Sequence, residues 1–532
     1  MISSTPRTGP VAAPVSTDRP PTIAPLVGAS HGTSSERGRE RTPQSSTDQG
    51  RFGRLFRTAP VFEVPRNELL ELGSRMVAAD TPDVPDGQID ACENPAIPAG
   101  YTYLGQFLDH DLTFDPVSDL DRQRDPDALH SLRTPRLDLD SLYGRGPADQ
   151  PFLYQDDDHA KLRLGARVHA SDPVLAGPDV PRIGNVALIG DPRNDENLIV
   201  SQLHSIFLRF HNAVVDEVRD DGFAEADVLE EAQRRVRWHY QWVILNDFLP
   251  RICGEDVMHD ILHREEFVVT TGWSPDPAPL DPADPGHPVS STTEVIRPRL
   301  RFYHYNDQPF LPLEFSVAAY RFGHSMVRQS YFINDFVRQQ TGGRRIPLFN
   351  EDANPLANLN GGRPLPDSWG FDWKFFFRTS GEPNRPQSSN RMDDRLVTPL
   401  GRLQGTNGTA IMRSLAVRNL LRGQQLGLPS GQAVARAMAI DPLPVSKLGL
   451  EALPALERHT PLWYYVLREA GELCQGCCLG PVGGRIVAET IVGLVCGDPL
   501  SYLRTEPAWI PTLPFAGDTF RMADLISVAQ GS

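Results

Sequence analysis

The chain has 532 residues and a formal net charge of -16, with 40% hydrophobic and 23% charged residues. This composition supplies enough apolar material for a globular core, although length alone does not choose between one large domain and several. The negative charge argues against a general nucleic-acid binder or a binder of anionic membranes, because no basic cluster is large enough to offset it.

Two further features of the sequence bear on localisation. No apolar run approaches the ~20 residues of a membrane-spanning helix. The N-terminus lacks the charged start and apolar stretch of a secretory signal peptide. We therefore expect a soluble chain with no integral membrane segment, which is cytoplasmic or exported by a non-classical route.

The first residues differ in composition from the rest. Residues 1–55 are rich in Pro, Ser, Thr and Arg and have few apolar side chains to bury together. Such a segment cannot offset the entropy of ordering, so we expect a disordered tail followed by one domain over residues 56–532. Within that domain, Leu69, Leu70 and Leu72 predict a short helix.

The stretch YTYLGQFLDHDLTFDP, residues 101–116, has the apolar spacing of a buried helix, which Asp115-Pro116 should end. Residues three and four apart share a helix face, so Gln106, Asp109 and His110 should face one side while Asp111 points about 100° away. Taken alone, these polar residues are typical of the solvated face of an amphipathic helix.

The segment TPRLDLDSLYG, residues 134–144, combines hard oxygen donors. Thr134 supplies a hydroxyl, Asp138 and Asp140 supply carboxylates, and such donors suit calcium. The segment has neither the internal glycine nor the closing glutamate of an EF-hand. For an isolated pattern of this kind, an acidic turn that caps a helix is the more common interpretation.

A firm amphipathic helix is predicted after GDPRNDEN, with Asn194 or Asp195 suited to cap its start. Arg193 and Glu196 lie three apart at that start and would project together from a helical turn, or form an exposed ion pair. The deeper histidines, His204 and His211, are interpreted as packing or hydrogen-bonding residues.

Further helices and loops follow. The spacing of Leu229, Val236 and Val243 predicts a helix that ends at Pro250, and the Pro- and Asp-rich region 270–300 reads as a surface loop. The next segment, PLEFSVAAYRFGHSMVRQSY, predicts a buried helix. Its only histidine is His324, and a lone helical histidine is more often structural than a ligand.

The C-terminal third contains loops around a short helix in WGFDWKFFF, then a helix with Asn419 and Arg422 three apart that ends at Gly423 or Gly427. The CQGCC cluster lacks a partner pair at zinc-finger spacing, which favours reduced thiols in a loop. The remaining segments are assigned to structure.

Five of these segments, in order, resemble the animal-type haem peroxidases of the peroxidase-cyclooxygenase superfamily, particularly its bacterial members. GQFLDHD, residues 105–111, matches the family's distal-helix motif, and RFGH, residues 321–324, matches its proximal motif. The resemblance spans roughly residues 90–525. It implies a mainly α-helical, single-domain haem peroxidase fold with little β structure.

On the distal side of the haem, the resemblance implies that His110 moves a proton within the bound peroxide and that Arg193 stabilises developing charge. Gln106 would position the peroxide or a halide. The family also esterifies its haem b through one aspartate and one glutamate, which correspond to Asp109 and Glu196. Some members add a sulfonium link from the next residue, a methionine, which is Asn197 here, so that link is expected to be absent.

On the proximal side, the resemblance implies that His324 binds the haem iron and that Asn419 accepts the hydrogen of its second ring nitrogen. Arg422 would bind a haem propionate, and Arg321 belongs to the same motif. The family's calcium site would be formed by Asp111, the hydroxyl and carbonyl of Thr134, the carbonyl of Arg136, Asp138 and Asp140.

The implied activity is oxidation of small donors by hydrogen peroxide through a ferryl haem, with iodide, bromide, thiocyanate or phenols favoured over chloride. One alternative is a fatty-acid dioxygenase on the same fold. Dioxygenases of the cyclooxygenase type place a tyrosine three residues before the proximal histidine. That position is Arg321 here, and Tyr320 is expected to point elsewhere. A third alternative is a non-catalytic haem-binding or structural protein.

Overall fold

The computed structural model describes residues 52–78, 91–113, 134–166, 177–274, 287–305, 309–379, 386–403, 413–513 and 519–531. The expected N-terminal tail therefore lies outside the described residues, except for its last four. Those four are ordered, because Phe52–Gly53 forms strand β1, which pairs in parallel with β7 (Leu311–Pro312). Residues 52–55 therefore belong to the described fold.

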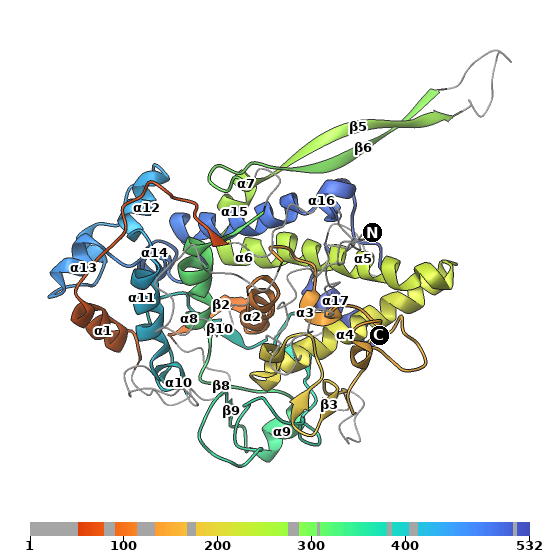
Figure 1. The fold of residues 1–532 in the computed structure, drawn as a ribbon, viewed down its shortest axis with the longest axis horizontal. Helices are drawn as coiled ribbons and strands as arrows, with labels where there is room; N and C mark the ends of the chain where they lie inside the picture. Colours follow the sequence, from red (N-terminus) through yellow and green to blue (C-terminus); the bar gives the residue numbers. More distant parts are fainter. Residues whose placement is uncertain are drawn as a thin grey trace, which may run out of the picture.

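The described part of the chain is mainly helical, as the sequence predicts (Figure 1). Its α-helices are α1 (Arg66–Arg75), α2 (Gly100–Leu112), α3 (Asp140–Tyr143), α4 (Leu198–Asp220), α5 (Glu225–Val243), α6 (Leu249–Cys253), α7 (Glu255–Ile261), α8 (Gly323–Met326), α9 (Asp335–Gln340), α10 (Thr398–Gly401), α11 (Leu415–Gln425), α12 (Gly431–Ala437), α13 (Pro454–Arg458), α14 (Leu462–Cys474), α15 (Pro481–Gly497), α16 (Tyr502–Thr505) and α17 (Met522–Gln530). Within these residues, no helix is long and apolar enough to cross a membrane.

The strands pair only two by two within the described ranges. Besides β1 and β7, they are β2 (Glu93–Pro98) with β10 (Ser388–Asn390), β3 (Arg182–Ile183) with β4 (Val186–Ala187), β5 (Leu262–Ser274) with β6 (His287–Pro298), and β8 (Ser330–Tyr331) with β9 (Ile346–Pro347).

The β5–β6 hairpin extends away from the helical body (Figure 1). The sequence prediction of a surface loop over 270–300 was therefore wrong at its flanks. The stretches FVVTT and SSTTEV on either side of the Pro- and Asp-rich centre are rich in β-branched residues, which favour extended pairing.

Helix α2 lies inside the molecule and packs against α4 and α8. The rings of Phe107 and Phe207 stack at a centroid distance of 4.5 Å and fix the α2–α4 contact. The helix ends at Leu112, because Thr113 is already extended. It is therefore shorter than predicted, and the expected stop at Asp115-Pro116 lies outside the described residues.

The start of α4 is built in two steps. Asp191 accepts the N–H of Arg193 and begins a 3₁₀ helix over Pro192–Asp195. Asn197 then caps α4 by accepting the N–H groups of Ile199 and Val200. The sequence prediction of Asn194 or Asp195 as the cap was wrong, because the 3₁₀ turn occupies those positions.

Two predicted helices differ from regular geometry. Helix α5 does not end at Pro250 but continues through a π-helical segment, Ile244–Phe248, into α6. Pro250 does not interrupt this stretch: it is the second residue of α6, directly after the π-helical segment, and the chain stays helical through it. Helix α11 ends as predicted, with Gly427 at φ 60° just beyond it.

The segment around His324 was expected to be one helix and is broken into three short pieces. A π-helical segment over Glu314–Ala318 leads into a 3₁₀ segment over Ala319–Phe322 and then into α8. The whole segment is largely buried. The Glu314 carboxylate accepts the N–H groups of Leu55 and Phe56, which ties the first described residues to this segment.

Candidate functional site

One cavity of about 510 Å³ lies between α2 and the segment that ends in α8. His110 lines it from α2, and His324 lines it from α8. The other sequence-predicted residues on its wall are Gln106, Asp109, Arg193, Glu196, Arg321 and Arg422. The structure thus brings together residues from four separate segments of the chain.

The predicted division of α2 into two faces is confirmed. Gln106, Asp109 and His110 line the cavity, whereas Asp111 belongs to a separate cluster of carboxylates. Asp109 accepts a hydrogen bond from the hydroxyl of Thr113 at 3.1 Å, one turn further on.

Arg193 is held in place at the cavity wall. Its guanidinium forms an ion pair with the buried Asp191 at 2.8 Å and donates to the carbonyl oxygen of His110 at 2.9 Å. Burial, and next the positive charge of Arg193, lower the pKa of the His110 imidazole below its usual value. A neutral imidazole and a guanidinium therefore lie side by side at the cavity.

Asn194, which the sequence suggested only as a helix cap, links two histidines. Its side-chain oxygen lies 2.8 Å from Nδ1 of His110, and its side-chain nitrogen lies 3.1 Å from Nδ1 of His204. All three side chains are buried. The prediction that His204 is a hydrogen-bonding residue is thus confirmed, although no sequence signal indicated its connection to His110.

Gln106 and Glu196 meet across the cavity. The amide nitrogen of Gln106 donates to the Glu196 carboxylate at 3.2 Å, and its oxygen accepts from the amide of Asn197 at 3.2 Å. Arg193 and Glu196 therefore do project into the same space, as their spacing indicated, but Glu196 bonds to α2 and Arg193 bonds to Asp191.

On the opposite wall, His324 contacts Asn419 of α11 with 3.0 Å between Nδ1 and the asparagine side-chain nitrogen. The Asn419 oxygen accepts from Arg321 at 2.9 Å. The predicted pairing of these two residues is present, but the amide nitrogen, not the oxygen, faces the imidazole. Arg321 is the cause, because it occupies the only acceptor of the amide. Burial, and then the charge of Arg321, lower the pKa of His324 to about 3.

A group of arginines forms one edge of the cavity. Arg321, Arg418 and Arg422 all line it. The sequence interpretation singled out the first and the last but not Arg418, which lies one turn before Arg422 on α11. Three guanidinium groups at one edge make that edge suited to carboxylate groups of a bound molecule.

Tyr320 also lines the cavity, which corrects the expectation that it points elsewhere. Its hydroxyl donates to the carbonyl oxygen of Gly105 in α2 at 3.1 Å, and its ring stacks on Phe315. The expectation assumed a regular helix, in which neighbouring residues are about 100° apart. The change from π-helical to 3₁₀ geometry at this point alters the direction of the side chain.

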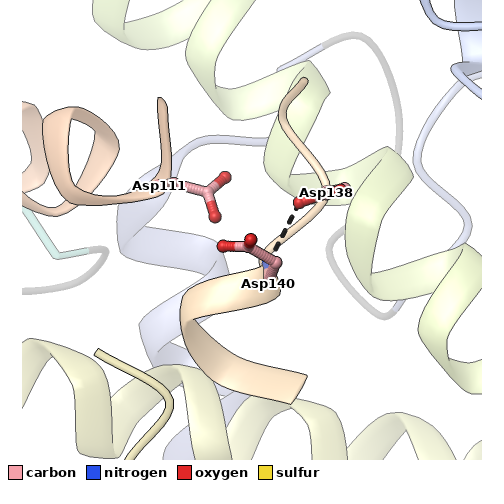
Figure 2. A group of neighbouring side chains, drawn as sticks. All are labelled: Asp111, Asp138 and Asp140. Atoms are coloured by element: carbon pink, nitrogen blue, oxygen red, sulfur yellow. Dashed lines mark hydrogen bonds between the residues drawn. The ribbon is translucent and has the colours of Figure 1, made fainter. Parts of the chain in front are cut away.

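The carboxylates of Asp111, Asp138 and Asp140 converge behind α2, with oxygens within 4.8 Å of one another (Figure 2). Burial, and then the two neighbouring carboxylates, raise the pKa of Asp111 well above its usual value. Leu139, which stands between Asp138 and Asp140 in the sequence, has a φ of 55°, a strained conformation for leucine.

Of the other predicted calcium ligands, Thr134 donates its hydroxyl to Asp138 at 2.7 Å, which brings it to the edge of the cluster. The N–H of Arg136 donates to the Thr134 carbonyl at 2.8 Å. The Arg136 side chain is directed to Asp498, with 3.7 Å between the charged atoms.

The cysteines of the CQGCC segment are free thiols at the end of α14, as expected. The only metal-type cluster of acids, histidines or cysteines found among the described residues is the aspartate cluster behind α2.

Comparisons with known proteins give a consistent result. The animal haem peroxidase family matches residues 120–443, more than half of the chain. The match includes Arg193, His324 and Asn419 but begins after α2, so His110 lies outside it.

Two curated relatives illustrate the similarity. A "Peroxidase-like protein" of Margaritifera margaritifera is 31% identical over 209 residues, which are 39% of this chain and 21% of the relative. The thyroid peroxidase of Sus scrofa is 24% identical over 310 residues, which are 55% of this chain and 28% of the relative. The chain thus spans well under a third of these relatives.

Solved structures share the fold. Peroxidase A from Dictyostelium discoideum has a TM-score of 0.53 at 15% identity, with 92% of this chain and 94% of that chain covered. A fatty acid alpha-dioxygenase of Oryza sativa has a TM-score of 0.54 at 13% identity, with 91% and 79% covered. Together with the family match and the site geometry, this leads to one conclusion: the chain belongs to the animal haem peroxidase family, whose members bind haem.

Proposed function

We propose that this chain binds haem b in the cavity between α2 and α8 and uses hydrogen peroxide to oxidise small donors, such as iodide, bromide, thiocyanate or phenols. One observation carries the proposal. Two imidazoles from distant parts of the chain, His110 and His324, line the same cavity, and each is held at Nδ1 by an asparagine.

The residues of the cavity fit a haem. Its volume of about 510 Å³ falls within the range of ~300–1,000 Å³ typical of cofactor pockets. Apolar side chains such as Val317 and Met326 line it together with a histidine on each wall. The arginines at its edge match the two propionate carboxylates of haem, with Arg422 as the residue expected to bind one of them.

His324 would hold the iron through Nε2, because Nδ1 is engaged by Asn419. Ligation through Nε2 requires the proton to sit on Nδ1. We infer that the Asn419 amide then turns its oxygen toward His324 and accepts that proton, which strengthens the imidazole as a donor. Arg321 would follow by moving its hydrogen bond to another acceptor.

Haem bound here would supply the iron at which peroxide is reduced. His110 would accept a proton from one oxygen of the peroxide and return it to the other, which would leave as water. Arg193 stabilises the negative charge that develops on the departing oxygen, because Asp191 and the His110 carbonyl hold its guanidinium at the wall. Gln106 orients the peroxide or a halide.

Asp109 and Glu196 are the carboxylates that we propose as ester links to the haem. Both line the cavity, and they come from different segments, α2 and the turn before α4. A sulfonium link is absent from the proposal because the residue after Glu196 is Asn197, which has no sulfur. The Asn197 side chain instead caps α4 and bonds to Gln106.

We also propose a calcium ion at the cluster of Asp111, Asp138 and Asp140, with further oxygens from Thr134 and the carbonyl of Arg136. Three carboxylates within 4.8 Å of one another repel unless a cation or protons neutralise them, and a divalent cation with oxygen ligands does so at neutral pH. The ion would join α2 to the segment before α3.

A second candidate, fatty-acid oxygenation, is favoured by one observation. The Tyr320 hydroxyl lies at the cavity wall, where a hydrogen atom of a substrate could be abstracted by an oxidised tyrosine. Oxygen uptake with linoleate, lost in Tyr320→Phe and independent of any peroxide-dependent donor, would place this function above the first.

The test of the main proposal uses purified holoprotein, stoichiometric hydrogen peroxide, and iodide, bromide, thiocyanate or a phenol as the donor. Donor oxidation should match the peroxide consumed, and His110→Ala should lower the rate constant with peroxide by ~10²–10⁴-fold. A rate that equals free haem and does not change in His110→Ala would contradict the proposal and favour a non-catalytic haem-binding protein.

A further inference from the structure

The polar chain His110–Asn194–His204 runs from the cavity into the core. His110 lines the cavity, but Asn194 and His204 are fully buried behind it. Asn194 lies in the 3₁₀ turn before α4, while His204 lies within α4, so two rigid pieces of one segment hold the amide. Asn194 does not cap either helix, because Asp191 and Asn197 do so.

The orientation of the Asn194 amide determines which nitrogen of His204 carries a hydrogen. Burial lowers the pKa of His204 to about 3, so its ring is neutral and only one of its nitrogens carries a hydrogen. Its Nδ1 lies 3.1 Å from the Asn194 nitrogen, which can only donate. The proton of His204 therefore sits on Nε2, an atom that is buried and has no hydrogen-bond partner among the described residues.

The amide transmits this arrangement to His110. With its nitrogen directed at His204, Asn194 has only its oxygen to offer to Nδ1 of His110, at 2.8 Å. That oxygen accepts, so Nδ1 of His110 carries the hydrogen and Nε2 keeps its lone pair. If the amide were reversed, His110 would carry the hydrogen on Nε2 and could not accept a proton there.

We propose that Asn194 is a positioning residue that fixes His110 in the tautomer needed to accept a proton from peroxide, and that His204 holds Asn194 in the required orientation. This inference deepens the proposed function and rests on it. It explains why a buried amide and a second histidine, neither of which touches the cavity, stand behind His110.

The experiment compares four variants of the holoprotein. Asn194→Leu removes both hydrogen bonds at nearly constant volume, whereas Asn194→Asp keeps an acceptor for Nδ1 of His110. His204→Phe removes the partner of the amide. His211→Phe is the matched control, because His211 is a fully buried histidine of the same helix that bonds to Tyr143 and Ala160.

Two quantities are measured. The first is the rate constant for reaction with hydrogen peroxide. The second is the C–O stretching frequency of carbon monoxide bound to the reduced protein, which falls when a neighbouring N–H donates to the bound ligand. This frequency reports on the His110 tautomer without turnover, and a purely structural role of Asn194 would not shift it. Soret absorbance and circular dichroism identify variants that have folded and bound haem.

We expect Asn194→Leu to lower the peroxide rate constant by ~10–100-fold, in the range of other supporting residues around metal-site histidines. The C–O frequency should fall in the same variant. Asn194→Asp should recover most of the rate, His204→Phe should show a smaller loss, and His211→Phe should lower stability alone.

An unchanged rate and C–O frequency in a folded, haem-bound Asn194→Leu protein would overturn the inference. If Asn194→Leu does not fold, His204→Phe provides the test: an unchanged peroxide rate constant and an unchanged C–O frequency in that variant would overturn the inference. A wild-type holoprotein that does not react with peroxide would instead contradict the proposed function, because the C–O measurement needs no peroxide chemistry.

Discussion

His110 and Asp111 are neighbours in the chain but lie on different faces of α2, one at the cavity wall and one in the aspartate cluster. Movement of one therefore turns or shifts the other, because both belong to the last turn of a buried helix. The proposed calcium site thus acts on the position of His110 through a single peptide unit.

Removal of calcium should destabilise the protein and disturb the cavity. A cation present at ~100 times its dissociation constant stabilises the folded state by about 2.7 kcal/mol. We expect a chelator to lower the unfolding temperature by several degrees and to slow the reaction with peroxide. Differential scanning calorimetry and stopped-flow absorbance measure both effects.

Two variants make this calcium prediction specific. Asp138→Asn should reproduce the effect of the chelator and remove any further response to it. Asp157→Asn, which changes an exposed acid outside the cluster, should behave as the wild type. An unaltered unfolding temperature after chelation would exclude a structural calcium ion.

The ester links predict how haem leaves the denatured protein. Wild-type haem should stay with the polypeptide in acidified acetone after reaction with peroxide, and the intact mass should include it. Asp109→Asn and Glu196→Gln should each keep one link, and the double variant should release all of its haem. Asp157→Asn, which changes an exposed acid outside both the cavity and the aspartate cluster, should keep both links. Full release from the wild type would rule the links out.

The pH dependence of the peroxide reaction follows from the protonation of His110. The neutral imidazole is the base, so the rate is lost as the pH falls through its pKa. Burial and the charge of Arg193 lower that pKa, so the acidic limb of the profile should lie below pH 6.5.

Arg193→Gln removes one of the two causes of the lowered pKa. The acidic limb should therefore move upward in pH, while the plateau rate falls by ~10²–10³-fold because a stabilising charge is lost. Stopped-flow rate constants between pH 4 and pH 8 measure both changes. If the acidic limb of the pH–rate profile does not move in Arg193→Gln, Arg193 does not lower the pKa of His110.

Asn419 should control the redox potential of the iron. Loss of its hydrogen bond in Asn419→Leu weakens His324 as a donor, which should raise the Fe(III)/Fe(II) potential. Asn419→Asp, with a stronger acceptor, should lower it. Spectroelectrochemical titration gives both values, and equal potentials in the two variants would contradict the proposed role.

Much of the site was accessible from sequence because it depends on local spacing. The separation of His110 from Asp111 follows from the helical repeat, and the helix needs only apolar residues at regular intervals to form. The same helical repeat predicted that Arg193 and Glu196, three residues apart, project from one turn. The residues at the opposite wall of the cavity, His324, Asn419 and Arg422, were identified only through the family resemblance.

Three predictions from the sequence were wrong, each for a structural reason that local residue patterns do not reveal. Tyr320 was misplaced because the segment before His324 is not a regular helix, and no residue pattern marks a change from π to 3₁₀ geometry. Asn194 was taken for a cap because asparagine is frequent at that position, whereas its tertiary contact with His110 is 84 residues distant in sequence. Pro250 was taken for a helix end although a first-turn proline is compatible with continuation.

Every role proposed for the cavity residues depends on His324 as the residue that binds the iron. The decisive measurement is the absorption spectrum in the Soret region, before and after one equivalent of hydrogen peroxide, for the wild type and His324→Ala. We predict a histidine-ligated haem band that shifts with peroxide in the wild type, and an altered or absent band with no such shift in the variant. Identical spectra and identical peroxide responses in the two proteins would contradict the account.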